Sequence, residues 1–392
     1  MTKRKIILGE YLEFEKGISV PRDRLFITNN IAYLHYGDIY KIYNHVVDIH
    51  KREIDEKYKK TQLLKDGDIV YNLTSESVDD LGKAVYIRNP NNIPFVSGME
   101  TTIMRVTDKS ILLPEYLNYI LSTYKFKCLL RQYVTGMKVY RVHPRDIGRI
   151  EIEVPDINEQ KKIIDILNPF NDKIELNNQM NQTLEEIASL LYKRWFVDFE
   201  FPDDKGNPYK SSGGEMVDSE LGMIPKGWEV KELGEVLEIS SGNRPVQKSE
   251  EKTKENIFPI VGASKIMGYT NNYILDDTNE VLIIGRVGTL GIIQEYREKI
   301  WVSDNTLIIK SNFQNYIKQY LSNVDFYSLN SGSTQPLITQ TTINKLLIVV
   351  PCNKVTDKFE KIESSNVRIK FCNTYEIKKI QRLKLELLKE LI

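Results

Sequence analysis

Three short patterns in this 392-residue chain contain residue types that could perform chemistry. The first, VPDINEQK at Val154–Lys161, has the PD and ExK letters of nucleases that hold a metal ion with two carboxylates and a lysine. The two halves lie too close together to come from separate strands that converge on one ion. We therefore interpret this segment as the start of a helix that Asp156 or Asn158 caps.

The second pattern is NPF at Asn168–Phe170, which resembles part of the NPPF site with which methyltransferases hold a flipped base. It lacks the second proline, and it falls within a seven-residue apolar repeat. A methyltransferase would also need a glycine-rich cofactor loop. We expect NPF to be structural.

The third pattern, GRVGTLG at Gly285–Gly291, follows the apolar run VLII and looks like a phosphate-binding loop. It has neither the GK[ST] ending of a P-loop nor the spacing of a dinucleotide fingerprint. We expect a turn between two strands. The alternative is that its backbone amides and Arg286 approach a DNA phosphate.

The histidines have no metal-ligand spacing, and we expect ordinary surface or turn residues at His35, His45, His50 and His143. The sequence therefore predicts no catalytic centre and no metal site.

Bulk composition describes a globular protein with no general affinity for polyanions. Lys plus Arg and Asp plus Glu number 54 each, so any nucleic-acid site must be a local patch. Three scattered cysteines fit free thiols in a reducing compartment. Neither a signal peptide nor an apolar run of about 20 residues is present. We expect a cytoplasmic protein with no membrane partner.

The elements that would position any site occur twice. LGEYLE at Leu8–Glu13 recurs as LGEVLE at Leu233–Glu238, and a glycine follows each at the same distance. Near the far end, Thr135–Pro155 aligns without a gap with Ser331–Pro351. Aligned residues differ in number by 225 at the start and 196 at the end, so the second copy is 29 residues shorter inside. This pattern predicts two copies of a whole domain with different interiors, as expected of domains that recognise different targets.

Each copy combines short β-rich runs, separated by Gly, Asn and Asp, with few helical patterns. The helical patterns are PEYLNYILSTYKFKCLLRQY at Pro114–Tyr133 and NYIKQYLSNVDFYSL at Asn315–Leu329. Each copy is therefore expected to be an α+β domain.

After each copy, apolar residues follow a seven-residue frame. The first stripe comprises Ile163, Leu167, Phe170, Ile174, Asn177, Asn181, Leu184, Ala188, Leu191 and Trp195. The second comprises Phe359, Ile362, Asn366, Ile369, Asn373, Glu376, Ile380, Leu383 and Leu387. Asparagines inside such stripes fix the register of a coiled coil.

Two helices of about 35 to 39 residues would each be roughly 50 to 60 Å long. We expect the two stripes to pair within the chain; the alternative is that each helix packs only onto its own domain. Pro169 is expected to kink or restart the first helix. Between the first helix and the second copy, Phe201–Val230 is rich in Pro, Gly, Ser and Asp, which predicts a surface crossing and not a core element.

Two segments carry a family resemblance. RWFVDFEFPDDKGNPYKSSGGEMVDSELGMIPKGWEVKELGEV at Arg194–Val236 resembles the central segment of specificity subunits of type I restriction-modification systems. VPDINEQKKIIDIL at Val154–Leu167 is similar to the entry into the first helical spacer of that family. The second helix lacks the EQ pair of this entry and reads NKVTDKFEKI instead.

The resemblance implies two target-recognition domains joined by two long helices that form an antiparallel coiled coil. Each domain would recognise one half of a bipartite, asymmetric sequence of double-stranded DNA, and the helices would set the gap. Family members dock two modification subunits, which bring S-adenosylmethionine, and through them restriction subunits that use ATP and Mg. The specificity subunit is not an enzyme and would need no cofactor of its own.

The resemblance also implies the domain boundaries. We expect the first recognition domain at 1–155, the first helical spacer at 156–200, a linker at 201–225, the second recognition domain at 226–351 and the second spacer at 352–392. A different class of protein, a two-domain coiled-coil scaffold that does not bind DNA, remains the alternative, because the net charge is zero.

Base recognition requires Arg, Lys, Asn or Gln at base edges, with phosphate contacts that set the position. In the loop GMKVYR and just beyond it, the candidates are Lys138, Tyr140, Arg141 and Arg145; the aligned loop GSTQPL offers Ser333, Thr334 and Gln335. The same position with different polar chemistry favours two different half-sites; a solvated turn is the alternative. Weaker candidates are Arg286, Lys265 and Asn305 in the second copy, and Asn72 with Arg105 in the first.

Overall fold

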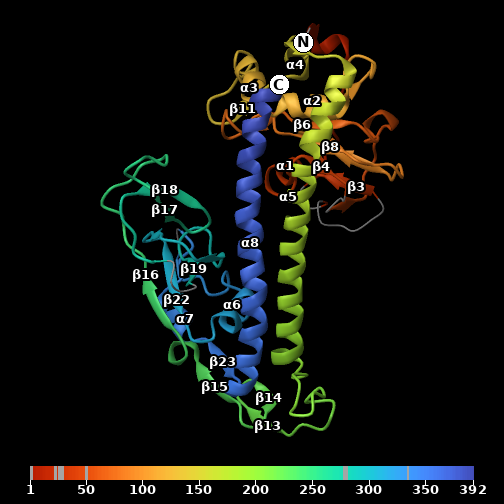
Figure 1. Cartoon of the computed structure of the whole chain (residues 1–392). Coiled ribbons are helices and arrows are strands. Elements are labelled where there is room, and N and C mark those ends of the chain that lie inside the picture. Colours follow the sequence, from red (N-terminus) through yellow and green to blue (C-terminus); the bar gives the residue numbers. More distant parts are fainter. Residues whose placement is uncertain (1–2, 22–23, 25–30, 49–51, 277–280, 333–334) are drawn as a thin grey trace. The chain divides into compact units, whose positions relative to one another are not determined.

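The computed structural model describes every residue except 1–2, 22–23, 25–30, 49–51, 277–280 and 333–334. Its contacts divide the chain into two compact units: Met1–Gln179 with Asn373–Ile392, and Met180–Cys372. Each unit contains one mixed domain and part of each of two long helices, α5 (Ile157–Tyr192) and α8 (Asn353–Leu391) (Figure 1). The predicted fold class is confirmed.

The domain of the first unit is built on a five-stranded sheet in the order β2-β10-β6-β8-β4. Neighbouring strands are antiparallel except β4 and β8. The central strands β6 and β10 are the most buried, in keeping with their apolar and β-branched runs IVYN and TTIMRV. The described strands are β1 (Arg4–Ile7), β2 (Leu12–Lys16), β3 (Ile31–Leu34), β4 (Val46–Val47), β5 (Glu53–Ile54), β6 (Ile69–Asn72), β7 (Thr74–Ser75), β8 (Ala84–Ile87), β9 (Phe95–Ser97), β10 (Thr101–Val106), β11 (Tyr140–Arg141) and β12 (Glu151–Val154).

Short helices cover this sheet. Seven of the eight residues of α2 are buried, and Pro114 occupies its first turn, where a missing N–H costs nothing. The main core cluster also contains Ile163 and Leu167 of α5 and Leu388 of α8, so both long helices are anchored in this unit. The described helices are α1 (Tyr36–Lys41), α2 (Pro114–Leu121), α3 (Tyr124–Arg131) and α4 (Pro144–Ile147).

The domain of the second unit has a four-stranded sheet in the order β16-β22-β19-β20 and a three-stranded sheet in the order β18-β17-β21. Its central strand β19 is buried throughout. The described elements are β13 (Met216–Ser219), β14 (Gly222–Pro225), β15 (Glu229–Glu232), β16 (Glu238–Ser241), β17 (Phe258–Val261), β18 (Ile266–Thr270), β19 (Val281–Gly285), β20 (Ile293–Tyr296), β21 (Trp301–Val302), β22 (Thr306–Lys310), α6 (Gln314–Ser322), α7 (Gln340–Asn344) and β23 (Leu347–Val350).

The sequence repeat is also a repeat of hydrogen bonds. The N–H of Leu8 donates to the carbonyl oxygen of Ile150 at 3.1 Å, and the N–H of Leu233 donates to that of Leu346 at 2.7 Å. Strand β1 pairs with β12 in one copy, as β15 pairs with β23 in the other. We call these shared strands and hydrogen bonds, together with the residues that align between the two copies or make equivalent backbone hydrogen bonds, the repeat frame.

The aligned glycines mark one close approach in this repeat frame. A Cβ on Gly17 would lie 1.9 Å from the carbonyl oxygen of Gly98, and a Cβ on Gly242 would lie 2.2 Å from that of Ser303. Only glycine fits at either position.

Within the first unit, α5 and α8 pair in antiparallel directions. Asn171 of α5 accepts a 2.6 Å hydrogen bond from Lys384, whereas Asn177, further along α5, donates one of 2.8 Å to Glu376, which precedes Lys384 in α8. The predicted pairing within the chain is confirmed, and Asn177 performs the expected role of a buried asparagine between two helices.

Within the second unit, the same two helices are also antiparallel. Glu185 of α5 forms an ion pair with Lys370 of α8. Directly after α5, residues Lys193–Val197 form one turn of π-helix. The ring centroids of its Trp195 and of Phe359 in α8 are 6.1 Å apart.

The predicted stripe of the second helix is only partly correct. Phe359 is fully buried, but Ile362 and Ile369 are 40% and 43% exposed. The buried face of α8 in this unit instead follows Val355, Phe359, Glu363 and Val367. These residues recur every four positions, so the contact face is rotated away from the seven-residue frame.

Two further expectations need correction. One helix spans Ile157–Tyr192 through Pro169, so the expected restart does not occur, and a kink there stays a prediction. The segment that was predicted to cross the surface contributes core residues, because Phe201, Ile224 and Trp228 are at most 5% exposed. Phe201 stacks on Trp228 with ring centroids 5.0 Å apart. Their apolar area outweighs the turn-rich composition around them.

Candidate nucleic-acid interface

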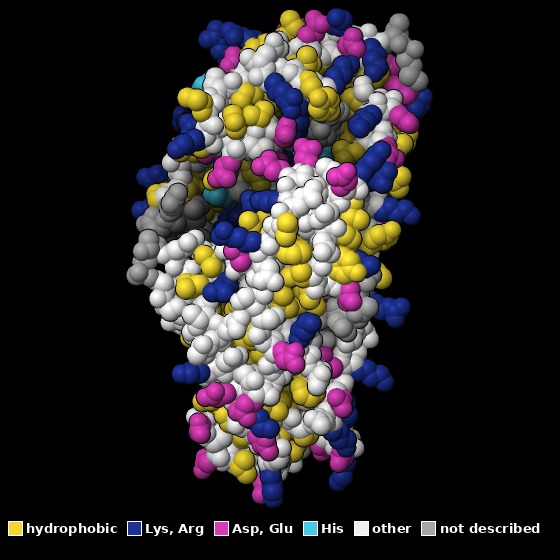
Figure 2. Space-filling model, turned by 90° about the vertical axis from the view of Figure 1, so that its left-hand side faces the viewer, with side chains coloured by type: hydrophobic (Ala, Val, Ile, Leu, Met, Phe, Trp, Pro, Cys, Tyr) yellow, Lys and Arg dark blue, Asp and Glu magenta, His cyan; other side chains and the backbone are white. Residues whose placement is uncertain are grey.

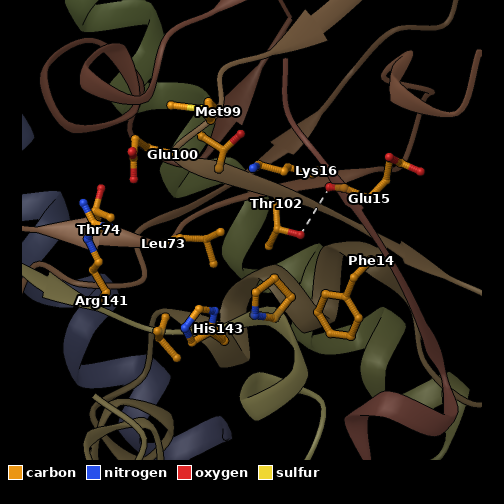
Figure 3. A pocket seen from close by; sticks show the side chains of 13 residues that line it. Phe14, Glu15, Lys16, Leu73, Thr74, Met99, Glu100, Thr102, Arg141 and His143 are labelled. Atoms are coloured by element: carbon orange, nitrogen blue, oxygen red, sulfur yellow. Dashed lines mark hydrogen bonds between the residues drawn. The ribbon is translucent and has the colours of Figure 1, made fainter. Parts of the chain in front are cut away.

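The first domain has an open pocket of about 510 Å³ at the ends of several strands (Figure 3). Its wall and floor contain apolar side chains, and four charged side chains lie around it. The residues that line it are Phe14, Glu15, Lys16, Leu73, Thr74, Met99, Glu100, Thr101, Thr102, Arg141, Val142, His143 and Pro144. Acidic, basic and hydroxyl groups in one place can both donate hydrogen bonds to base edges and accept hydrogen bonds from them.

Of the candidates predicted in the first domain, Arg141 is the one that lines this pocket. Its backbone exchanges hydrogen bonds of 2.8 and 2.9 Å with Thr135, and β11 pairs Arg141 with Thr74. The backbone of Arg141 is therefore fixed, while its side chain is exposed.

The remaining candidates from this loop and just beyond it do not line the pocket. Lys138 is exposed at the tip of the loop, Tyr140 is half-buried in β11, and Arg145 is exposed in α4. The loop turns tightly at Gly136, where a Cβ would lie 2.1 Å from the carbonyl oxygen of Val139. The aligned Gly332 has the same contact, at 2.0 Å from the carbonyl oxygen of Gln335. This contact explains why both copies have glycine there.

In the second domain, Arg286 lies at the position of the repeat frame that Leu73 occupies in the first. The N–H of Arg286 donates to Asn305 at 3.0 Å, as that of Leu73 donates to Glu100 at 2.9 Å. The carbonyl oxygen of Arg286 accepts a hydrogen bond from Ile338 at 2.9 Å. Arg286 therefore lies at the position in the second domain that is equivalent to a pocket residue of the first domain.

The other candidates of the second domain are more scattered. Gln335 follows the turn at Gly332, and Ser333 and Thr334 lie outside the described residues. Lys265 is exposed in the connection between β17 and β18, and the repeat frame does not include it. Asn305 is half-buried and contacts Arg286 through its backbone carbonyl group.

Two weaker candidates are structural. Asn72 is fully buried and donates to the carbonyl oxygen of Tyr36 at 3.1 Å. Arg105 forms a 3.0 Å ion pair with the buried Asp68 and also donates to two backbone carbonyl groups. Neither side chain is available to DNA, so these two predictions were wrong. Each partner comes from a distant part of the sequence.

Two of the patterns that suggested chemistry are accounted for by local structure. Asp156 accepts hydrogen bonds from the N–H groups of Asn158 and Glu159, at 2.9 and 3.1 Å, and so caps α5. Asn168 of NPF accepts a 2.7 Å hydrogen bond from the hydroxyl of Tyr119. Both predictions of a structural role are confirmed.

The third pattern, GRVGTLG, lies in the connection between the antiparallel strands β19 and β20, as predicted. The alternative, that its amides and Arg286 approach a DNA phosphate, stays a prediction.

His50 lies outside the described residues, and the other three histidines have different environments. His35 accepts a hydrogen bond from the N–H of Gly37 and caps α1, and His143 lines the pocket of the first domain. His45 is buried and stacks on Tyr119 at 4.2 Å, which corrects the expectation of a surface residue. Burial lowers the pKa of His45 well below the usual value.

Two features are absent from the part of the chain that the structure describes. No group of three or more His, Cys, Asp or Glu side chains in this part of the chain could hold a metal ion. Among the same residues, no helix is long and apolar enough to cross a membrane.

The charge balance is visible on the surface. On the face in Figure 2, Lys and Arg side chains occur beside Asp and Glu, and uncharged side chains cover much of the area between them. On this face, contacts with DNA would thus depend on individual side chains and not on one broad basic surface.

Comparison with known families identifies the class of protein. The chain matches the type I restriction modification DNA specificity domain over residues 8–186 and 225–359, which together make up most of its length. It belongs to this family. The specificity subunits are not the catalytic subunits of their systems, which confirms that the chain is not an enzyme.

Individual proteins similar to this chain are named as specificity subunits of type I restriction enzymes. The chain is 27% identical over 282 residues to the type I restriction enzyme MjaIX specificity subunit of Methanocaldococcus jannaschii, covering 66% of this chain and 63% of that protein. It is 24% identical over 468 residues to the type I restriction enzyme HindI specificity subunit of Haemophilus influenzae, covering 98% and 99%. Its fold resembles the crystal structure of the S subunit of a type I restriction-modification system from M. genitalium, with a TM-score of 0.56 and 15% identity over 100% and 96% of the two chains.

Proposed function

We propose that this chain is the DNA specificity subunit of a type I restriction-modification complex. Each domain recognises one half of a bipartite, asymmetric sequence in double-stranded DNA. The paired helices α5 and α8 set the gap between the half-sites and dock the modification subunits.

One observation in this chain carries the proposal beyond family membership. The two domains share the repeat frame, yet equivalent positions hold different side chains, such as Leu73 and Arg286, or Arg141 and Leu337. If the function required only two docking domains, nothing would favour polar differences at these particular positions. Two different half-sites require such differences, because base edges are distinguished by their hydrogen-bond donors and acceptors.

The partners follow from this function. We propose that two modification subunits bind the chain and that restriction subunits join through them. S-adenosylmethionine, ATP and Mg²⁺ would be bound by those partners and not by this chain. A cytoplasmic location fits this role and the cysteines, since Cys128, Cys352 and Cys372 are all exposed and unpaired.

Selection from a random duplex library tests the proposal, using the full chain in complex with its modification subunits. Enrichment of two different half-sites at a fixed gap is the expected result. Exchanging residues 1–155 for the corresponding domain of a relative should change one half-site and leave the other half-site and the gap intact. The unexchanged chain, taken through the same selection, provides the matched control.

A pool without enriched sequences would contradict the proposal and favour the two-domain scaffold. Enrichment of one undivided site would contradict the division of recognition between the two domains.

A further inference from the structure

Three segments of the second domain converge on the hydroxyl of Ser241. The Nη1 of Arg286 lies 3.1 Å from Ser241 Oγ, and the Nε2 of Gln340 lies 2.9 Å from the same atom. Ser241 ends β16, Arg286 follows β19, and Gln340 begins α7. All three side chains are half-buried, so each remains partly accessible to solvent.

These three positions belong to the repeat frame. In the first domain, Ser241 corresponds to Lys16, Arg286 to Leu73 and Gln340 to Pro144. All three of those residues line the pocket of the first domain, and Figure 3 labels Lys16 and Leu73. The repeat frame thus places a lysine, a leucine and a proline at one site and a serine, an arginine and a glutamine at the equivalent site. A change of all three side chains on a shared backbone is the change that a new DNA sequence would require.

We propose that Arg286 and Gln340 are the base-reading pair of the second domain and that Ser241 positions them. Arg286 recognises a guanine and Gln340 an adenine of the same half-site. This inference rests on the proposed function and assigns a role to Gln340 that its sequence context did not suggest.

The chemistry of both side chains supports the assignment. A guanidinium group presents two parallel N–H donors to the O6 and N7 atoms of guanine, and a glutamine amide donates to N7 and accepts from N6 of adenine. Ser241 engages one donor of each side chain. The second amide N–H and the Oε1 atom of Gln340 remain for a base, and Arg286 keeps its Nη2 donors.

The geometry reduces the entropic cost of recognition. Long side chains such as Arg and Gln lose rotamer freedom when they are held against a base. The shared hydroxyl restricts both before DNA arrives, and the backbone of Arg286 is held by Asn305 and Ile338. Ser241 is a positioning residue, because it acts on DNA through the other two side chains.

Three variants test the proposal in the same library selection, with the full chain and its modification subunits. Gln340→Ala should reduce discrimination at one adenine by roughly 5- to 100-fold. Arg286→Lys keeps the charge but loses the planar fork, so discrimination at one guanine should fall while affinity for unrelated DNA persists. Ser241→Ala should weaken discrimination at both base pairs, and Ser241→Thr should restore it.

The chain provides two controls. Ser322→Ala removes the hydroxyl of an exposed serine at the end of α6, which donates to the carbonyl oxygen of Lys318 in the same helix, so the base preferences should not change. The half-site of the first domain is an internal control and should stay the same in every variant.

The outcomes separate this inference from the proposed function. If the wild-type complex enriches two half-sites and Arg286→Lys and Gln340→Ala leave both unchanged, the inference is overturned and the proposed function stands. An equal loss on all sequences would show contact with the DNA backbone alone and would also overturn it. If the wild-type complex enriches no bipartite sequence, the proposed function itself fails.

Discussion

Within the first unit, Asn177 Nδ2 donates a 2.8 Å hydrogen bond to Glu376 Oε2 and so connects α5 to α8. Asn177 is fully buried, and Lys173 forms a 3.3 Å ion pair with the same carboxylate oxygen. The hydrogen bond from Asn177, with the contact from Lys173, lowers the pKa of Glu376, so this group is a carboxylate at neutral pH. A polar pair between two helices is satisfied in one alignment, and sliding either helix would break it.

The first prediction concerns this pair. Asn177→Asp would place a second carboxylate against Glu376, and the thermal midpoint of the first unit should fall by several degrees at pH 7. Adding Glu376→Gln makes residue 376 the donor and restores a hydrogen bond, so the double variant should recover most of the loss. Thermal unfolding followed by circular dichroism measures both. A single variant as stable as the wild type would show that the pair does not stabilise the helix pairing.

A second prediction concerns Lys384, whose Nζ donates to Asn171 Oδ1 at 2.6 Å and lies 5.6 Å from the ring centroid of Tyr119. Burial lowers the pKa of Lys384 to about 8. The unfolded chain keeps the ordinary value of about 10.4, so between these two pH values the unfolded state binds more protons. The free energy of unfolding should therefore rise with pH in this window, by about 1–3 kcal/mol.

The reference for this measurement is Lys384→Met, which cannot titrate. Urea unfolding of both proteins at pH 7, 8, 9 and 10 isolates the contribution of Lys384, because all other groups titrate in both. Stability of the wild type should approach or exceed that of the variant as pH rises. A difference that is constant with pH would contradict the lowered pKa.

The duplication was predictable from sequence because the repeat frame depends on close backbone contacts. Gly17, Gly242, Gly136 and Gly332 each lie where a Cβ would meet a carbonyl oxygen, so both copies retained glycine and the alignment could be seen. The start of α5 was predictable for a similar reason, since Asp156 caps it through contacts within three residues.

Individual side-chain contacts between distant segments of a domain were not predictable. Arg105 and Asn72 have side chains of the types that read bases. Only the fold shows that Arg105 is paired with Asp68 and that Asn72 is hydrogen-bonded to Tyr36. The sequence around Gln340 does not indicate a site, because Ser241 and Arg286 come from distant segments of the chain. The one indication in the sequence was the gapless alignment, which places Gln340 opposite Pro144, close to the predicted loop. Hydrophobic periodicity identified the long helices. It did not identify the buried face of α8, because that face depends on which elements pack against the helix.

A third prediction concerns Gln160, which attaches α5 to the first domain. This side chain is fully buried, accepts from the N–H of Leu113 at 2.9 Å and donates to the carbonyl groups of Ile111 and Pro155. Gln160→Leu has a similar size but leaves three backbone groups unpaired, and should lower the free energy of unfolding by about 2–4 kcal/mol. Chemical denaturation measures the loss, with the exposed Gln179→Leu as the control. A loss below that of the control would show that the backbone groups find other partners.

A fourth prediction concerns Gln335 in the loop of the second domain. Gln335→Ala should cost about 1–3 kcal/mol at one base pair and leave the half-site of the first domain untouched. Competition binding with single-base variants of the enriched sequence measures this. A uniform loss across sequences would indicate a contact with the DNA backbone, and no loss would remove Gln335 from the interface.

The last prediction concerns Arg141 in the first domain. Its backbone is fixed on both sides by Thr135, so its exposed side chain leaves a rigid hairpin beside the pocket that Lys16, Glu100 and Thr74 also line. A side chain on a fixed backbone at a polar pocket is suited to contact a base edge. Arg141→Ala should therefore cost about 1–3 kcal/mol at one base pair of the first half-site and leave the second half-site intact.

The matched control for Arg141 is Arg149→Ala, which removes another exposed arginine of the same domain. Arg149 contacts Asp146 at 3.0 Å and does not line the pocket, so its loss should leave the base preferences unchanged. Competition binding at two salt concentrations distinguishes a phosphate contact from a base contact. A phosphate contact contributes to the salt dependence of binding and does not depend on the base sequence. If Arg141→Ala reduces affinity equally for all sequences and flattens the salt dependence, Arg141 contacts phosphate, and base recognition by the first domain must come from Lys16 or the pocket itself.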